Sequence, residues 1–145
     1  MAEHDELIDA GIRLPIVATI GPAADDILDK INKWRENEEN DQIVFHDPPD
    51  ATDIFVLALS ADGDIPSQTI EHVRTINVPI VVAINDVDNV NANIPLVLSR
   101  LARIGITPLE WGGDYAIARI FSDGRGIPDL MNTLEHQLLL RGFSA

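Results

Sequence analysis

The sequence predicts an α/β fold in which helices cover a mostly parallel sheet. Short apolar, β-branched runs alternate with helical patterns along the chain, and such alternation forms parallel sheets through right-handed crossovers. Two of the runs, residues 53–59 and 80–84, are continuously apolar, which is typical of strands buried on both faces. The 145 residues fit one domain, so we expect residues 14–145 to form it, after a lead-in of residues 1–13.

Each element follows from a local pattern. Apolar runs predict strands over residues 14–21, 42–47, 53–59, 80–84 and 116–121. Apolar residues at helical spacing predict helices over residues 25–37, 66–76, 95–104 and 128–140. Pro22 and the pair Asp25–Asp26 suit the start of the first helix, because carboxylates are stabilised near its free N–H groups. We expect Trp34 to cover the core or the sheet edge, and Trp111 to anchor the loop before the last strand.

The charge and composition exclude several classes of function. Twenty-four acidic residues against ten basic ones give a formal net charge of −14, which disfavours binding to nucleic-acid phosphates. This acidity indicates either a strongly solvated surface, as in adaptation to high salt, or a basic protein partner. No apolar run approaches the ~18–20 residues that cross a bilayer. The absence of cysteine excludes disulfides and thiolate metal sites and fits a cytoplasmic protein.

Two segments resemble the GTPase domain of bacterial translation initiation factor two. Residues 62–71, Asp-Gly-Asp-Ile-Pro-Ser-Gln-Thr-Ile-Glu, are similar to the acidic loop before that family's third helix. Residues 105–114, Gly-Ile-Thr-Pro-Leu-Glu-Trp-Gly-Gly-Asp, resemble a stretch peculiar to that factor. The likeness runs from about residue 14 to residue 140. It implies a three-layer P-loop NTPase fold of the G-domain type, with a shortened switch region.

The phosphate-binding motif of this family is degenerate here. In Gly-x-x-x-x-Gly-Lys-Ser/Thr, backbone N–H groups wrap the phosphates and the lysine neutralises them. Gly21 opens the corresponding loop, but the loop is about three residues short, and Asp25 and Asp26 replace the lysine and the hydroxyl. Lys30 lies a full turn into the predicted helix, so we do not expect it to substitute for the missing lysine.

The switch motif is altered as well. The family's Asp-x-x-Gly reads Asp47-Pro48-Pro49-Asp50, so Asp47 keeps the magnesium-positioning aspartate while Asp50 replaces the glycine. The two prolines stiffen a segment that must move in a GTPase. No threonine-bearing loop that could close over magnesium is visible between residues 37 and 42. The sequence therefore offers no segment that could become ordered or disordered with the bound nucleotide, as the switch loops of a GTPase do.

The guanine motif is partly kept. The family's Asn-Lys-x-Asp reads Asn-Asp-Val-Asp over residues 85–88. The resemblance implies that Asp88 would accept hydrogen bonds from guanine and that Asn85 would brace the phosphate loop. Asp86 cannot cover the base as the stem of a lysine would. Ser122 keeps the serine of the last motif, while an aspartate replaces the alanine that follows it.

The aspartates at the strand ends and the histidines do not require a metal site to explain them. Five aspartates are expected near the carboxyl edge of the sheet: Asp47, Asp62, Asp64, Asp86 and Asp88. Oxygen ligands of this kind bind Mg²⁺, but aspartates at strand ends also cap helices and shape turns, and we favour that role over a metal site. The four histidines show no metal-ligand spacing, and Ala51 stands where the family has its catalytic histidine. No catalytic residue is therefore assigned.

The leading hypothesis is a pseudo-GTPase that acts as a protein-binding or structural module tied to translation or the ribosome, with no cofactor. The alternative is a genuine guanine-nucleotide-binding protein or minimal GTPase. It would hold GTP or GDP with Mg²⁺ weakly through the vestigial positions Gly21, Asp47, Asn85, Asp88 and Ser122. The expected partner is a protein, ribosome-associated or basic, with no nucleic acid and no membrane involved.

Overall fold

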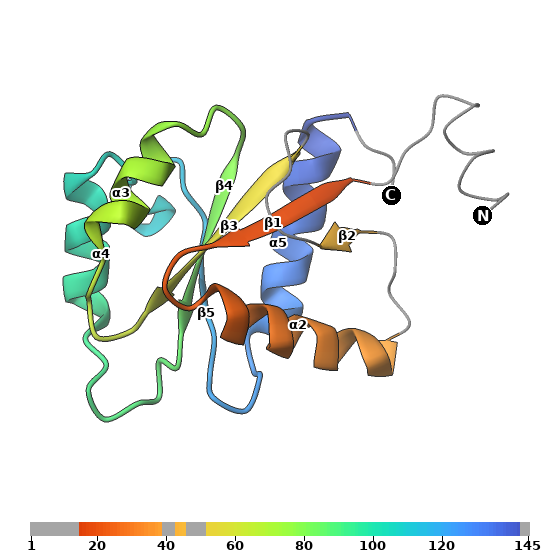
Figure 1. Cartoon of the computed structure of the whole chain (residues 1–145), viewed down its shortest axis with the longest axis horizontal. Helices are drawn as coiled ribbons and strands as arrows, with labels where there is room; N and C mark the ends of the chain where they lie inside the picture. Colours follow the sequence, from red (N-terminus) through yellow and green to blue (C-terminus); the bar gives the residue numbers. More distant parts are fainter. Residues whose placement is uncertain (1–14, 39–42, 46–51, 143–145) are drawn as a thin grey trace, which may run out of the picture.

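A computed structural model describes residues 15–38, 43–45 and 52–142 (Figure 1). The strands are β1 (Ile16–Ile20), β2 (Val44–Phe45), β3 (Ile54–Ser60), β4 (Ile80–Asn85) and β5 (Ile117–Arg119). The helices are α2 (Ala24–Glu38), α3 (Ser67–Arg74), α4 (Ile94–Arg103) and α5 (Ile127–Leu140), with a 3₁₀ turn η1 (Leu109–Trp111) before β5. Within the described ranges, no helix is long and apolar enough to span a membrane.

The strands form one sheet in the order β2-β1-β3-β4-β5, and all four strand pairings are parallel. The expectation of an α/β fold with a parallel sheet is thus confirmed. The longest register joins β3 to β4 from Phe55 opposite Ile80 to Ser60 opposite Asn85. In a doubly wound sheet of this order, the chain reverses direction between β1 and β3, and ligands bind at the carboxyl ends of the strands beside that reversal.

Helices cover both faces of the sheet, so the architecture has three layers (Figure 1). Helices α2 and α5 pack on one face, and α3 and α4 on the other. Strand β3 shows the alternation that this requires. Ile54, Val56 and Ala58 point to the core between the sheet and helices α2 and α5. Their neighbours Phe55, Leu57 and Leu59 point to the core between the sheet and helices α3 and α4. Because both faces are buried, the strand is continuously apolar.

Helix α4 shows how the sequence sets the bounds of an element. The Asn93 side chain accepts a hydrogen bond from Leu96 N at 3.3 Å, and a proline lies in the first turn, as helix N-termini favour. Val97, Leu98 and Leu101 form its buried stripe. The last turn carries Arg100 and Arg103, whose charges complement the carboxyl end of the helix dipole.

Two expectations about tryptophans had different outcomes. Trp34 packs against the core, as predicted. Trp111 lies on η1, in the segment before β5, and its side chain is 48% exposed, so its expected role as an anchor of that loop stays a prediction. Four predictions concern residues outside the described ranges: the lead-in of residues 1–13, Asp47, the switch residues 48–50, and Ala51.

Candidate functional site

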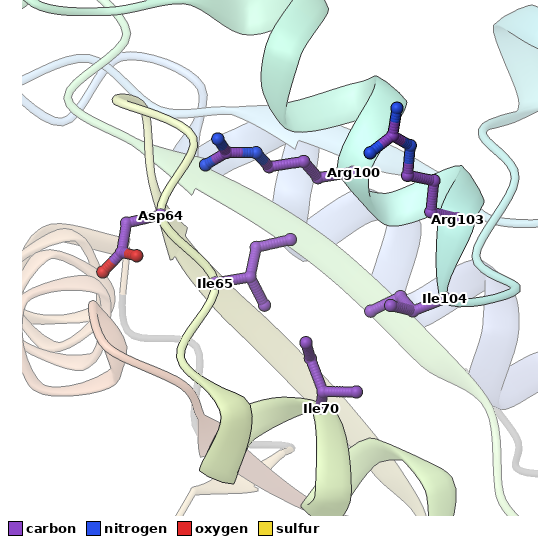
Figure 2. Close-up of a pocket in the computed structure, with 6 residues that line it drawn as sticks. All are labelled: Asp64, Ile65, Ile70, Arg100, Arg103 and Ile104. Carbon is purple, nitrogen blue, oxygen red and sulfur yellow. The ribbon is translucent and has the colours of Figure 1, made fainter.

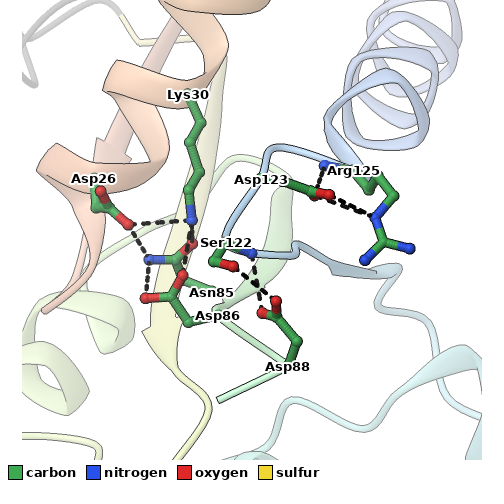
Figure 3. A network of polar contacts seen from close by, with 8 residues as sticks. All are labelled: Asp26, Lys30, Asn85, Asp86, Asp88, Ser122, Asp123 and Arg125. Carbon is green, nitrogen blue, oxygen red and sulfur yellow. Dashed lines mark hydrogen bonds and ion pairs between the residues drawn. The ribbon is translucent and has the colours of Figure 1, made fainter.

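The candidate site lies at the carboxyl ends of β1, β4 and β5, where three loops meet (Figure 3). The β1–α2 turn contributes Gly21, the loop after β4 contributes Asp86 and Asp88, and the loop after β5 contributes Ser122. This is the edge of the sheet at which open α/β folds bind ligands. The geometry of each loop decides what this edge can hold.

The β1–α2 turn is closed on itself. Gly21 has a φ of +102°, and a Cβ atom there would lie 2.5 Å from Ala58 O on β3. Ala23 N donates to that same carbonyl oxygen at 3.1 Å, and Ala24 N donates to Gly21 O at 3.2 Å. Pro22 has no N–H to offer. The amides of Ala23 and Ala24 are therefore engaged inside the protein and not free for a ligand.

Lys30 occupies the space between α2 and the end of β4. Its Nζ donates to Asn85 Oδ1 at 2.6 Å and to Asp86 Oδ1 at 2.9 Å, and lies 3.2 Å from Asp26 Oδ2 (Figure 3). The Lys30 side chain is only 13% exposed. Asp26 and Lys30 are four residues apart, so both project from the same side of α2. We name these four residues, Asp26, Lys30, Asn85 and Asp86, the lysine cluster.

Asn85 connects the members of the lysine cluster. It ends β4, is 4% exposed, and donates through Nδ2 to Asp26 Oδ2. This hydrogen bond is the largest cause that lowers the pKa of Asp26 below its ordinary value of 3.8. Desolvation opposes the shift in part, and the nearby Lys30 adds to it. Asp86 adopts a φ of +54°, unique among the described non-glycine residues. Aspartate tolerates this left-handed conformation better than most residues do.

Asp88 and Ser122 form a separate pair on the exposed side of the site. Asp88 Oδ1 accepts from Ser122 N at 3.0 Å, and Oδ2 accepts from Ser122 Oγ at 2.7 Å. The hydroxyl first and the backbone amide second hold the pKa of Asp88 below 3.8. Because a carboxylate has about four lone-pair positions, each oxygen keeps acceptor capacity toward solvent.

The loop after β5 is fixed by a second ion pair. Arg125 Nε lies 2.9 Å from Asp123 Oδ2, and Arg125 N donates to Asp123 Oδ1 at 3.0 Å. The guanidinium carbon lies 4.2 Å from the centroid of the Phe121 ring. The backbone hydrogen bond from Arg125 is the main cause that lowers the pKa of Asp123. The Asp123 carboxylate is therefore turned toward its own loop.

The structure thus brings some of the predicted residues together and separates others. Asn85 lies in the lysine cluster, Asp88 joins Ser122, and Gly21 lies in the turn that leads into α2. Asp62 Oδ1 accepts from Asp64 N at 3.0 Å and so shapes its own turn. Within the part of the chain that the structure describes, no three histidine or acidic side chains gather as metal ligands.

Sequence reasoning missed two participants, Asp26 as a partner of Lys30 and Arg125. The four-residue spacing of Asp26 and Lys30 was a signal for the first pair. The short spacing of Asp123 and Arg125 was a weaker one. Nothing in the sequence indicated that Lys30 would reach across to Asn85, which lies 55 residues further along the chain.

Comparisons with known proteins give the chain's relatives. No protein-family model matches it. It is 46% identical over 88 residues to translation initiation factor IF-2 of Nitratiruptor sp., which covers 58% of this chain and 10% of that factor. It is 37% identical over 125 residues to the factor of Rubrobacter xylanophilus, which covers 74% of this chain and 18% of that factor.

A comparison with solved structures matches oxidised flavodoxin 1 from Bacillus cereus with a TM-score of 0.43 and 14% identity, over 90% of this chain and 99% of that chain. The chain spans less than a fifth of the length of the factors that it matches. By sequence, the chain is a domain related to a segment of translation initiation factor IF-2.

Proposed function

We propose that this chain is a pseudo-GTPase, a P-loop NTPase-type domain of the G-domain kind that serves translation as a protein-binding or structural module in the cytoplasm. The observation that carries the proposal is the lysine cluster beside the closed β1–α2 turn. Relatedness to IF-2 supports the connection with translation. It does not by itself assign an activity, because one fold hosts many functions.

The electrostatics of the lysine cluster support the loss of nucleotide binding. Lys30 is the only cation of the cluster and faces two carboxylates, Asp26 and Asp86, so the cluster carries a net charge of −1. A triphosphate would have to separate Lys30 from both carboxylates. Its negative charges would then approach Asp26 and Asp86 with no other cation of the cluster to offset the repulsion. It would also find the Ala23 and Ala24 amides already engaged. Phosphoryl-transfer sites depend on the opposite arrangement, with free amides and an available lysine.

The second candidate is weak guanine binding, and one observation favours it. Asp88 and Ser122 lie together at an exposed position, and the Asp88 carboxylate retains acceptor capacity. Gly21, Asp47, Asn85, Asp88 and Ser122 would be the positions that hold GTP or GDP with Mg²⁺. This candidate predicts preference for guanine over adenine and loss of binding in Asp88→Asn.

Thermal unfolding of the full chain with nucleotides separates the two candidates. At about 100 times Kd, a ligand that binds only the native state adds about 2.7 kcal/mol. That gain raises the melting temperature of a domain of this size by roughly 5–10 °C or more. We expect Mg²⁺ with GTP, GDP or ATP at millimolar concentration to leave the melting temperature within 1 °C, a threshold on the order of experimental error. A rise with GTP and GDP that ATP does not give, and that Asp88→Asn abolishes, would establish the second candidate instead.

The protein-binding part of the proposal needs its own measurement. Co-sedimentation of the chain with ribosomes from a cell extract, with and without added GTP, tests it. We expect association that is unchanged by GTP, GDP or depletion of both, because no step of binding depends on nucleotide. Association that requires GTP would contradict the proposal.

A further inference from the structure

A second surface feature, lined by none of the residues of the lysine cluster or the Asp88–Ser122 pair, lies between α3 and α4. It is a cavity of about 240 Å³ lined by Asp64, Ile65, Ile70, Arg100, Arg103 and Ile104 (Figure 2). We call it the α3–α4 pocket. At roughly 30 Å³ per water, it has room for about eight waters. This is below the ~300–1,000 Å³ of sites for drug-sized ligands, so it suits one or two side chains of a partner.

The floor of the pocket is aliphatic. In Figure 2, Ile65 from the β3–α3 loop, Ile70 from α3 and Ile104 at the end of α4 point toward one another. All three are partly buried, and Ile65 and Ile104 pack on the core beneath. An apolar side chain that entered here would remove the remaining exposed surface of these isoleucines from water, which is favourable.

The rim of the pocket carries two guanidinium groups. Arg100 Nη1 donates to Gly63 O. Gly63 lies so close to α4 that a Cβ atom on it would be 2.8 Å from Leu96 Cδ2. This bond fixes Arg100 along the pocket while most of its five N–H donors stay available. Arg103 follows three residues later, on the same side of the helix.

Neither arginine has a carboxylate partner among the residues that the structure describes. Asp64 lines the same pocket, but Figure 2 shows its carboxylate turned away from both guanidinium groups. Cations in a last turn stabilise the helix dipole, but that role needs no apolar cavity beside them.

We propose that the α3–α4 pocket binds a short segment of a partner protein in which an aliphatic residue adjoins an acidic one. The aliphatic side chain occupies the isoleucine floor, and the carboxylate accepts hydrogen bonds from Arg100 and Arg103. Guanidinium groups suit this ligand, since their planar forks match a carboxylate in bidentate geometry. The inference rests on the proposed protein-binding function and gives it one surface and one kind of partner sequence.

Titration of the ¹⁵N-labelled full chain with terminally blocked peptides tests the proposal. The probe is a glycine–serine hexapeptide with a central Leu-Glu pair, and the controls carry Leu-Gln, Ser-Glu or Leu-Lys instead. We expect the Leu-Glu peptide to shift the amide signals of Ile65, Ile70 and Ile104 with a Kd on the order of 1 mM. Binding should weaken as salt is raised, and each control should bind at least about tenfold more weakly.

Variants assign the effect to the arginines. Arg100→Gln combined with Arg103→Gln should weaken binding of the Leu-Glu peptide about tenfold or more. The affinity of Arg100→Lys should lie between those of the parent chain and the double variant, because lysine keeps the charge but loses the bidentate geometry of the guanidinium group. Arg141→Gln, at the end of α5, is the matched control and should bind as the parent chain does. Thermal unfolding of each variant confirms that it folds.

Three outcomes would overturn the inference. They are no shift at the three isoleucines, equal binding of the Leu-Gln peptide, or unchanged binding by the double arginine variant. The same samples titrated with GTP and Mg²⁺ keep the two proposals apart. Saturable GTP binding contradicts the proposed function whatever the peptides do, whereas a failure of the peptides alone removes only the pocket assignment.

Discussion

Lys30 is the residue on which the candidate site depends most. Its ammonium group satisfies the buried Asn85 oxygen and lies between the Asp26 and Asp86 carboxylates. Lys30→Met would leave that oxygen without its donor and the two carboxylates without their cation. We expect the free energy of unfolding to fall by about 1–3 kcal/mol, the cost of a buried polar group left unsatisfied.

Urea unfolding measures this loss, and Lys33→Met is the matched control. Lys33 lies on the same helix and is exposed. Its replacement should change the free energy of unfolding by no more than about 0.5 kcal/mol, as is usual for surface positions. Equal stability of the two variants would show that Lys30 does not hold the α2–β4 junction together.

The Asp88–Ser122 pair makes a prediction about pKa. Ser122→Ala removes the hydroxyl, the larger cause of the lowered pKa of Asp88, but keeps the backbone donor. The pKa of Asp88 should therefore rise toward 3.8 and stay below it. Carboxyl ¹³C shifts followed against pH measure this change, with Asp123 as an internal control because Arg125 dominates its shift.

The sign of the accompanying stability change follows from the direction of the pKa. A carboxyl group whose pKa is lowered on folding stabilises the native state above its unfolded pKa. For Asp88, this contribution is present above about pH 3.8 and is lost as the pH falls through the lowered native value. Ser122→Ala should therefore reduce the acid sensitivity of unfolding in that window. An Asp88 pKa that is identical in the parent chain and the variant would contradict the assignment.

Among the elements, the β1–α2 turn makes the sharpest prediction. Gly21→Ala combines a positive φ with a Cβ placed 2.5 Å from Ala58 O, so the turn must open or β3 must shift. Gly105→Ala is the matched control, because its φ is +91° but no atom lies within 4 Å of the added Cβ. We expect Gly105→Ala to cost about 1–2 kcal/mol and Gly21→Ala clearly more.

Unfolding in urea gives the loss of stability for both variants. The difference between the two losses is the contribution of the steric clash with β3, because both variants share the cost of an alanine at positive φ. If the two glycine variants were equally stable, the turn would not be packed against β3 in solution. The Ala23 amide would then lose its partner on β3 and be free to serve a ligand, which would weaken the case against phosphate binding.

Most of the elements could be predicted from the sequence, since local pattern and burial agree. The apolar runs of β3 and β4 have only one environment that suits them, the middle of a parallel sheet. The turn η1 was missed because three residues carry no periodicity.

The candidate site was predictable only in part. Strand ends placed Asn85, Asp88 and Ser122 near one edge, since parallel strands share their carboxyl side. The reach of Lys30 to Asn85 depends on how α2 packs against the sheet, and tertiary packing of this kind leaves no trace in local sequence. The engagement of the Ala23 amide by Ala58 is a backbone contact and has no side-chain signature at all.

The charge of the whole molecule predicts how stability depends on salt. A formal charge of −14 on 145 residues destabilises the compact state through self-repulsion. Raising KCl from about 0.1 M to about 1 M shortens the Debye length from about 10 Å to about 3 Å. The melting temperature should rise across this range, with NaCl giving the same result as KCl. A flat or falling melting temperature would show that the acidic surface does not limit stability.

In the proposed function, the phosphate side of the candidate site is closed by the chain's own residues. Titration of the full chain into fluorescently labelled GTP and GDP with Mg²⁺ tests it most directly, with a GTPase domain that has an intact phosphate loop as the positive control. We predict no saturable binding, and hence a Kd weaker than about 1 mM, for the parent chain. Saturable binding with a Kd below about 1 mM, competed by unlabelled GTP but not by ATP, would contradict the proposed function.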